Sequence, residues 1–193
     1  VIVCSDNPYS EIGYDGYKPL SFLEVPGAKD VGIEINSVSK PYNMTGWRIG
    51  YVVAGKRLSG TLRKLHYYAV LCPNAISQKA AVAALTGPQN RVQEMVKEYD
   101  RRRKHVLGQL NRIESLSYTK PKGAFYVFPD FSNFEKSDEV FASRLLKKAG
   151  VVTAPGSGFG RAGKGHLRIS YSVSYEQVKE GMERIRKFLE SKA

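Results

Sequence analysis

The sequence predicts an α/β protein in which a mostly parallel sheet is followed by a smaller α+β domain. The first part contains three short apolar runs, "VIVCSD", "VGIEIN" and "IGYVVAG", with the length and composition of parallel strands covered by helices. After a long charged helical stretch, the pattern changes to short strands interspersed with two helices, which is typical of an α+β domain. We therefore place the first domain at 1–95 and the second at 96–193.

The elements follow from periodicity and from turn or cap residues. The three apolar runs predict buried strands at 1–6, 31–36 and 49–55, and two free, buried thiols, Cys4 and Cys72, are expected beside them. Further along the chain we expect helices at 56–67, 74–85 and 89–113, strands at 117–119 and 125–128, a helix at 138–148, two strand-like runs, "VVTAPG" and "HLRISYS", and a closing helix at 175–189.

The net charge of +12 and the pI near 9.7 raise the question of a nucleic-acid partner. Carboxylates interrupt the basic residues at helical spacings, and no basic surface interleaved with aromatic residues is evident, which favours a solvated surface and no nucleic-acid partner. A non-catalytic basic binding module is the alternative. The chain has neither an apolar run of about 20 residues nor a signal-peptide pattern, so we expect a cytoplasmic protein without a membrane partner.

Lys40 lies in "SVSKPYNMTGWRIGY", directly after the second predicted strand. Ligands of open α/β sheets bind at the carboxyl ends of strands, where the hydroxyls of Ser37 and Ser39 could hold a phosphate. Arg48 could add a bidentate phosphate contact. A lysine beside a phosphate site indicates a phosphorylated aldehyde as cofactor, whereas a lysine taken alone is more often a solvated charge.

Asp6 and Tyr9 lie in "DNPYSE", at the end of the first predicted strand. Asp, Asn and Pro are residues that favour turns, so a simple turn is one interpretation of this segment. Together with Lys40, however, an aspartate at a neighbouring strand end could keep a pyridine nitrogen protonated, as an electron-sink cofactor requires. Tyr9 could then donate a hydrogen bond to the ring oxygen of such a cofactor.

These residues give the sequence its resemblance to the class I and II aminotransferases that depend on pyridoxal 5'-phosphate (PLP), which have fold type I. Arg168 in "LRISYS" matches the family's arginine for the substrate carboxylate, and "KPKGAFYVFPDF" resembles the segment that lines the substrate entrance. The pattern S-x-S-K-x-x-x-M-x-G-x-R-x-G is met by Ser37, Ser39, Lys40, Met44, Gly46, Arg48 and Gly50, and D-x-x-Y by Asp6 and Tyr9.

The resemblance implies a role for each residue. Lys40 would hold PLP covalently and move the proton at the substrate Cα. Asp6 would pair with the pyridine nitrogen and Tyr9 with the ring oxygen. The phosphate would be bound by Ser37, Ser39 and Arg48, and Arg168 would bind the substrate α-carboxylate.

The resemblance also implies that 1–95 is the C-terminal part of the PLP-binding large domain and that 96–193 is the small domain. The family's phosphate loop, ring-stacking aromatic residue and asparagine are missing from this sequence. We therefore expect the C-terminal half of a larger, homodimeric enzyme, which by itself does not sustain transamination. The pattern is most similar to LL-diaminopimelate aminotransferases, with 2-oxoglutarate as acceptor, and aspartate or alanine aminotransferases are the alternatives.

Overall fold

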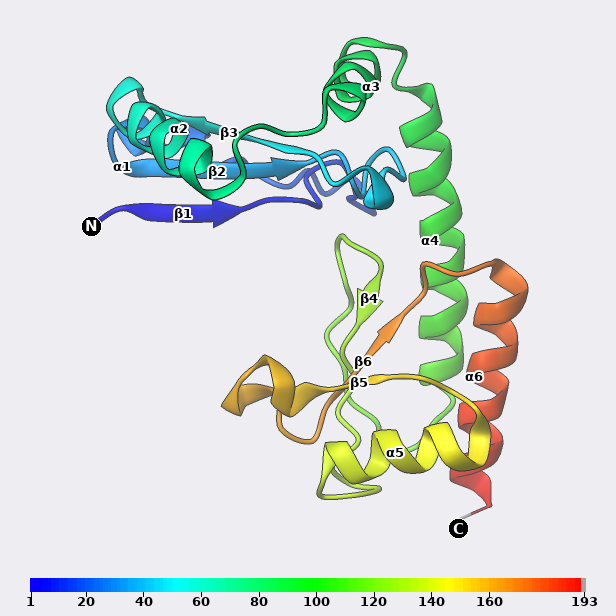
Figure 1. The fold of residues 1–193 in the computed structure, drawn as a ribbon. Helices are drawn as coiled ribbons and strands as arrows, with labels where there is room; N and C mark the ends of the chain where they lie inside the picture. Colours follow the sequence, from blue (N-terminus) through cyan, green and yellow to red (C-terminus); the bar gives the residue numbers. More distant parts are fainter. Residues whose placement is uncertain (192–193) are drawn as a thin grey trace. The chain divides into compact units, whose positions relative to one another are not determined.

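The computed structural model describes residues 1–191 and divides the chain into two compact units. The first unit runs from Val1 to Val96, and the second begins at Lys97. The boundary falls within one long helix, α4 (Asn90–Leu110), which is drawn in green in Figure 1. Each unit has its own sheet, and each is described separately.

The first unit is built on a three-stranded sheet in the order β1-β2-β3. Its strands are β1 (Val3–Asp6), β2 (Gly32–Ser37) and β3 (Gly50–Ala54), and its helices are α1 (Ala28–Val31), α2 (Lys56–Val70), α3 (Ala75–Thr86) and the first part of α4. The strands β1 and β2 are parallel, as expected. The prediction of a third parallel strand is wrong, because β3 runs antiparallel to β2. The connection from Ser37 to Gly50 contains only one turn of 3-10 helix, whereas a parallel crossover usually contains a full α-helix that packs on the sheet.

The prediction that all three strands are buried is also wrong. Val3 of β1 has an exposed fraction of 38%, and Val52 and Val53 of β3 have exposed fractions of 49% and 42%. Within the described residues, α2 contacts β3 but buries only Leu58. Cys4 and Cys72 are exposed, so the expectation of buried thiols is wrong. Cys4 lies in β1, which the helices of residues 1–96 leave uncovered, and Cys72 lies in the connection between α2 and α3.

The core of the first unit lies beyond the end of β2. Val38, Met44 and Ala81 are buried against one another, with Tyr42 and Ile49 packed around them. Asn74 caps the N-terminus of α3 by accepting a hydrogen bond from Ser77 N at 3.0 Å, which satisfies one of the unpaired amides of the first turn. The segment from Val38 to Ile49 therefore packs its buried side chains against α3.

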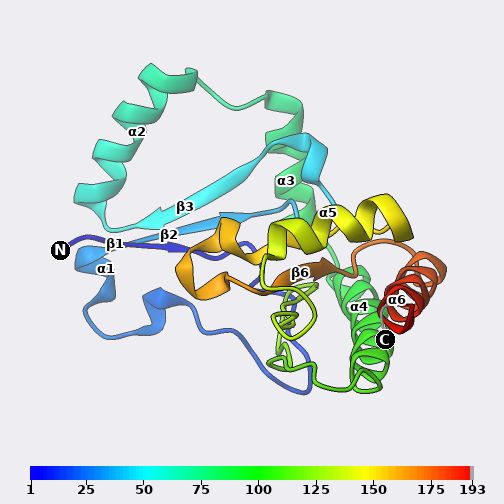
Figure 2. The same cartoon turned by 90° about the horizontal axis from the view of Figure 1, so that it is seen from below.

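The second unit contains an antiparallel sheet in the order β4-β6-β5. Its strands are β4 (Tyr126–Val127), β5 (Ala154–Pro155) and β6 (Leu167–Ser170), and its helices are the rest of α4, α5 (Asp138–Ala149) and α6 (Tyr175–Glu190). Figures 1 and 2 show α4 and α6 side by side. The strand expected at 117–119 is reduced to an isolated bridge between Ser117 and Asp130.

Helix α5 begins and ends where its terminal residues predict. The Ser137 side chain accepts from Val140 N at the N-terminus, and Gly150 adopts the left-handed conformation with φ 64° at the C-terminus. Phe141 and Leu145 of this helix are fully buried. These caps and apolar contacts place the buried carboxylate of Asp138 at the first position of α5.

No helix within residues 1–191 combines the length and the apolar character needed to cross a membrane.

Candidate active site

The parallel pairing of β1 and β2 brings two of the predicted site segments to the same edge of the first sheet. Asp6, the last residue of β1, lies opposite Ile35 of β2, and Asn7 N donates to the Ile35 carbonyl at 2.8 Å. Strand β2 ends two residues later at Ser37, and Lys40 follows it. Asp6 and the segment Ser37–Lys40 therefore share the carboxyl edge of the parallel pair, where ligands of α/β sheets bind.

The antiparallel strand β3 brings Arg48 to this same edge. Ser37 pairs with Gly50, so the chain leaves the sheet after Ser37 and re-enters it thirteen positions later, directly opposite. Gly50 is required by this close pairing, because a Cβ atom there would lie 2.6 Å from the Asn36 carbonyl oxygen. Lys40 and Arg48 both belong to the loop that this pairing closes.

The loop that carries Lys40 is held by hydrogen bonds as well as by its apolar core. Ser37 Oγ accepts from Ser39 N at 3.1 Å, and the buried Ser39 accepts at its carbonyl oxygen from Thr45 Oγ1 at 3.3 Å. On the other side of the loop, Ser77 Oγ of α3 donates to the Trp47 carbonyl at 2.8 Å. Contacts of this kind fix a site before a ligand arrives.

Arg48 has a left-handed backbone, with φ 52°, which is uncommon for a residue other than glycine, asparagine or aspartate. Its side chain is exposed, and Nη1 donates to the Thr45 carbonyl at 2.7 Å. That bond uses one of the five N–H donors of a guanidinium. Strained backbone of this kind persists where the surrounding structure imposes it and is concentrated at ligand sites.

Tyr9 lies in the turn that follows β1. Its carbonyl oxygen accepts from Ile12 N at 2.9 Å, and its side chain is half-buried. Both interpretations of "DNPYSE" therefore describe the same segment, since it forms a turn and also begins at the strand end that carries Asp6.

The chemistry of the side chains at this edge fits a phosphorylated pyridine aldehyde. Two hydroxyls, a guanidinium and an ammonium group come from one short loop, and a carboxylate comes from the neighbouring strand end. The four donors suit a phosphate and an aldehyde, and the carboxylate suits a protonated ring nitrogen. No metal ligand set is needed for this chemistry.

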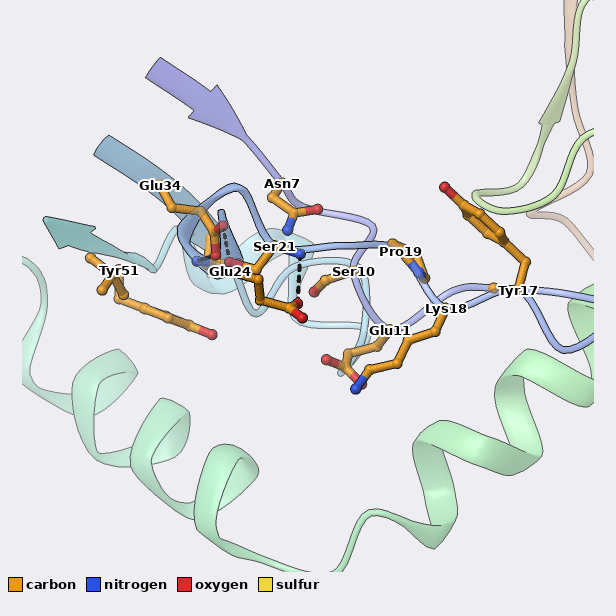
Figure 3. A pocket seen from close by; sticks show the side chains of 13 residues that line it. Asn7, Ser10, Glu11, Tyr17, Lys18, Pro19, Ser21, Glu24, Glu34 and Tyr51 are labelled. Atoms are coloured by element: carbon orange, nitrogen blue, oxygen red, sulfur yellow. Dashed lines mark hydrogen bonds between the residues drawn. The ribbon is translucent and has the colours of Figure 1, made fainter. Parts of the chain in front are cut away.

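A neighbouring pocket of about 440 Å³ in the first unit contains none of the predicted residues. It is lined by Asn7, Ser10, Glu11, Gly13, Tyr17, Lys18, Pro19, Ser21, Glu24, Glu34, Asn36, Tyr51 and Val53, and Figure 3 shows their side chains. Burial pushes the pKa of Glu34 up, but hydrogen bonds from Ser21 and Asn36 and from backbone amides outweigh it, so the pKa is lowered. Three glutamates against one lysine make this pocket unfavourable for a phosphate.

A second pocket of the first unit, of about 610 Å³, does include Arg48. Its other lining residues are Asn43, Gly46, Trp47, Asn74, Ile76 and Ser77.

Arg168 belongs to the second unit, where it lies on β6 and is half-buried. Its guanidinium carbon is 4.5 Å from the centre of the Tyr126 ring and 4.6 Å from the centre of the Phe159 ring. The sequence motifs do not single out either aromatic residue. Strand alternation could have found Tyr126, because Tyr126 pairs with Ser170 and so lies diagonally across from Arg168 on the same face. Phe159 ends a 3-10 helix of four residues, Gly156–Phe159, which is too short to show a periodic signal.

The sequence of residues 1–185 matches the family model described as aminotransferase class I and II. An LL-diaminopimelate aminotransferase from Dehalococcoides mccartyi (strain CBDB1) is 45% identical over 184 residues, covering 95% of this chain and 47% of the relative. An aspartate aminotransferase from Pyrococcus abyssi is 41% identical, covering 100% of this chain and 50% of the relative.

Solved structures agree with these relatives. The crystal structure of the aromatic aminotransferase from Pyrococcus horikoshii OT3 superposes with a TM-score of 0.94 at 40% identity, covering 100% of this chain and 52% of that one. The aspartate aminotransferase from Rhizobium meliloti gives a TM-score of 0.91 at 36% identity, covering 98% of this chain and 50% of that one. The chain thus spans about half the length of the relatives that it matches.

Proposed function

Because this chain belongs to the class I and II aminotransferase family, we propose that the whole protein transfers an amino group from an amino acid to a 2-oxo acid with PLP as its cofactor. Members of this family use PLP. The observation that carries the proposal is the arrangement at the carboxyl edge of β1 and β2, where Asp6 ends one strand and the loop that carries Lys40 and Arg48 follows the other. A lysine that is only a solvated surface charge would not require a carboxylate and a guanidinium at the same edge of the sheet.

Each side chain has a definite task under this proposal. Ser37, Ser39 and Arg48 hold the cofactor phosphate, Asp6 holds the pyridine nitrogen in its protonated form, and Tyr9 donates to the ring oxygen. PLP, when bound, supplies an electron sink for the bond that breaks at the substrate Cα. Lys40 Nζ would hold the cofactor covalently and, once free, would move the proton at the substrate Cα.

LL-diaminopimelate is the amino donor that we propose, with 2-oxoglutarate as acceptor. The support is that the relative of 45% identity is an LL-diaminopimelate aminotransferase. A panel of donors that also contains aspartate, alanine and aromatic amino acids tests this choice, since other relatives carry the names aspartate and aromatic-amino-acid aminotransferase. We further propose that the full-length protein is a cytosolic homodimer, as the family resemblance implies, and that the charge of +12 serves a solvated surface and not nucleic acid.

Cofactor attachment tests the proposal directly. The full-length protein is incubated with PLP, reduced with borohydride and digested, and the peptides are mapped by mass spectrometry. The pyridoxyl group is expected on Lys40, because this lysine alone follows β2 at the edge shared with Asp6. A pyridoxyl group on Lys56 or Lys64 of α2 would contradict the assignment.

Replacing Arg168 with lysine is expected to weaken capture of the amino acid far more than binding of PLP. An ammonium is a point charge and cannot form the paired hydrogen bonds of a guanidinium, and a lost hydrogen bond to a charged group costs roughly 1.5–3 kcal/mol. Amino-acid affinity and PLP affinity are measured separately on the full-length variant. An unchanged amino-acid affinity would refute the role of Arg168.

A further inference from the structure

Two aromatic rings from different segments contact the guanidinium of Arg168. Tyr126 reaches it from β4, and Phe159 reaches it from the end of a short 3-10 helix, Gly156–Phe159. Both ring centres lie within 5 Å of Cζ, at 4.5 and 4.6 Å, which is the range of cation–π attraction. The rings therefore restrict the rotation of a side chain that would otherwise be flexible.

Phe159 is 54% exposed, and an aromatic ring beside it restricts its position. Its ring meets Phe128 edge-on, with centres 5.9 Å apart, and Phe128 stacks on His166 at 5.0 Å. Phe159 thus contacts the ring of Phe128 as well as the guanidinium of Arg168.

The loop that carries Phe159 follows a narrow path that only glycine permits at two points. A Cβ atom on Gly156 would lie 2.0 Å from the Gly163 carbonyl oxygen, and one on Gly163 would lie 2.1 Å from the Gly156 carbonyl oxygen. The backbones of Gly156 and Gly163 are therefore in direct contact within the segment Gly156–Gly165, which we call the glycine loop. This contact restricts the conformation of the residues between Gly156 and Gly163.

Asp138 of α5 anchors both ends of the glycine loop. Its carboxylate is buried, with an exposed fraction of 3%, and accepts from Ser157 N at 2.7 Å and from Gly165 N at 3.4 Å. Burial pushes the pKa of Asp138 up, but the hydrogen bonds from Ser157 and Gly165 outweigh it, and the pKa is lowered. The carboxylate is thus ionised at neutral pH, and its bonds to the loop are charge-assisted.

We propose that Phe159, held in place by Asp138 through the glycine loop, is a positioning residue for Arg168 and sets the affinity of the site for the substrate carboxylate. This inference rests on the proposed role of Arg168 as the carboxylate-binding group. Rings packed against the guanidinium leave its N–H edge as the side that meets a ligand. A guanidinium held in this way loses less freedom when it forms a paired hydrogen bond to a carboxylate.

The test compares propionate with propionamide as ligands of the full-length protein carrying PLP. Phe159→Leu removes the ring and is expected to weaken propionate binding about three- to tenfold, as the loss of a cation–π contact predicts, with propionamide binding unchanged. KM for the amino acid should rise by the same factor while kcat stays within about twofold, because uniform binding is lost. Phe159→Tyr keeps a ring and should retain wild-type affinity.

Phe134→Leu is the matched control, because Phe134 is a half-buried phenylalanine of the same unit that packs on Phe131. It should leave propionate affinity unchanged. Asp138→Asn should weaken propionate by a similar factor to Phe159→Leu, and Tyr126→Leu provides a second ring deletion if one variant fails to fold. Wild-type propionate affinity in Phe159→Leu, or equal losses in Phe134→Leu, would overturn the inference.

The outcome for Arg168→Lys separates this inference from the proposed function. If Arg168→Lys weakens propionate binding and Phe159→Leu does not, the role of Arg168 stands and only the positioning role fails. If Arg168→Lys has no effect on propionate binding, the role of Arg168 in the proposed function itself fails.

Discussion

Replacing Lys40 with alanine is expected to lower the rate of amino transfer by the full-length protein by at least about a hundredfold, and up to about 10⁴-fold. The amine is proposed both to hold the cofactor and to carry the proton at the substrate Cα, and alanine can do neither. The fold should remain intact, because Lys40 is only partly buried and the core beneath its loop is formed by Val38, Met44 and Ala81. The rate is measured with LL-diaminopimelate and 2-oxoglutarate, and circular dichroism checks the fold.

Lys56→Ala is the matched control for Lys40→Ala. Lys56 is the first residue of α2, is exposed and follows β3, away from the carboxyl ends of the parallel strands. Its removal should change the rate less than about twofold, as expected for a surface substitution. Activity that survives in Lys40→Ala, or an equal loss in both variants, would show that Lys40 is a surface charge.

Replacing Asp100 with alanine is expected to lower the free energy of unfolding by about 3–5 kcal/mol, because it removes a carboxylate partner of a buried charge. That charge is the guanidinium of Arg103, whose side chain is fully buried on α4. Arg103 bonds to Asp100 through Nε at 2.8 Å and Nη2 at 2.6 Å, and its Nη1 donates to the Pro121 carbonyl at 2.9 Å. Chemical denaturation of the variant and of the wild type measures the difference.

Glu94→Ala is the control on the same helix. Glu94 pairs with Arg91, and the side chains of Arg91 and Glu94 are 84% and 56% exposed. Exposed ion pairs contribute roughly 0–1 kcal/mol, so this variant should be nearly as stable as the wild type. Equal losses in the two variants would mean that burial of Arg103 does not set the cost.

The effect of Asp100 should also depend on pH in a definite direction. Burial pushes its pKa up, but hydrogen bonds and charge from Lys104 and Arg103 outweigh this, so the folded-state pKa is lowered. The stabilising contribution is then complete above the unfolded-state pKa of about 3.9 and is lost as the pH falls through the folded-state pKa. The difference between wild type and Asp100→Ala should therefore shrink only in strongly acidic solution.

Local signals were sufficient for most of the helices. Helix α3 begins after its cap Asn74 and α6 begins after Ser174, as side chains that accept from the first-turn amides predict. The motif around Lys40 also depends on local order, since Ser37, Ser39, Lys40 and Arg48 are near neighbours in the chain. Sequence alone therefore determined the secondary structure in outline, the candidate residues and the family resemblance.

Strand direction and burial were decided by tertiary structure. An apolar run such as "IGYVVAG" has the same composition in a parallel or an antiparallel strand, and the direction of β3 is seen only in its pairing with β2, where Ser37 lies opposite Gly50. Likewise, the exposure of Cys4 and Val52 depends on which helices cover the sheet. The periodicity of a strand does not show whether a helix from elsewhere in the chain packs on it.

The surroundings of Arg168 show the same division most clearly. The motif "LRISYS" marks the arginine, but Tyr126, Phe159 and Asp138 are distant from it in the chain and come from a strand, a loop and a helix. They meet only because β4 pairs with β6 in one register and because the Asp138 carboxylate binds two amides of the glycine loop. The sequence by itself thus determined the residue types and the local elements. The contacts around Arg168 depend on strand register and on hydrogen bonds between distant segments, and a local sequence pattern does not report the free energy of such contacts.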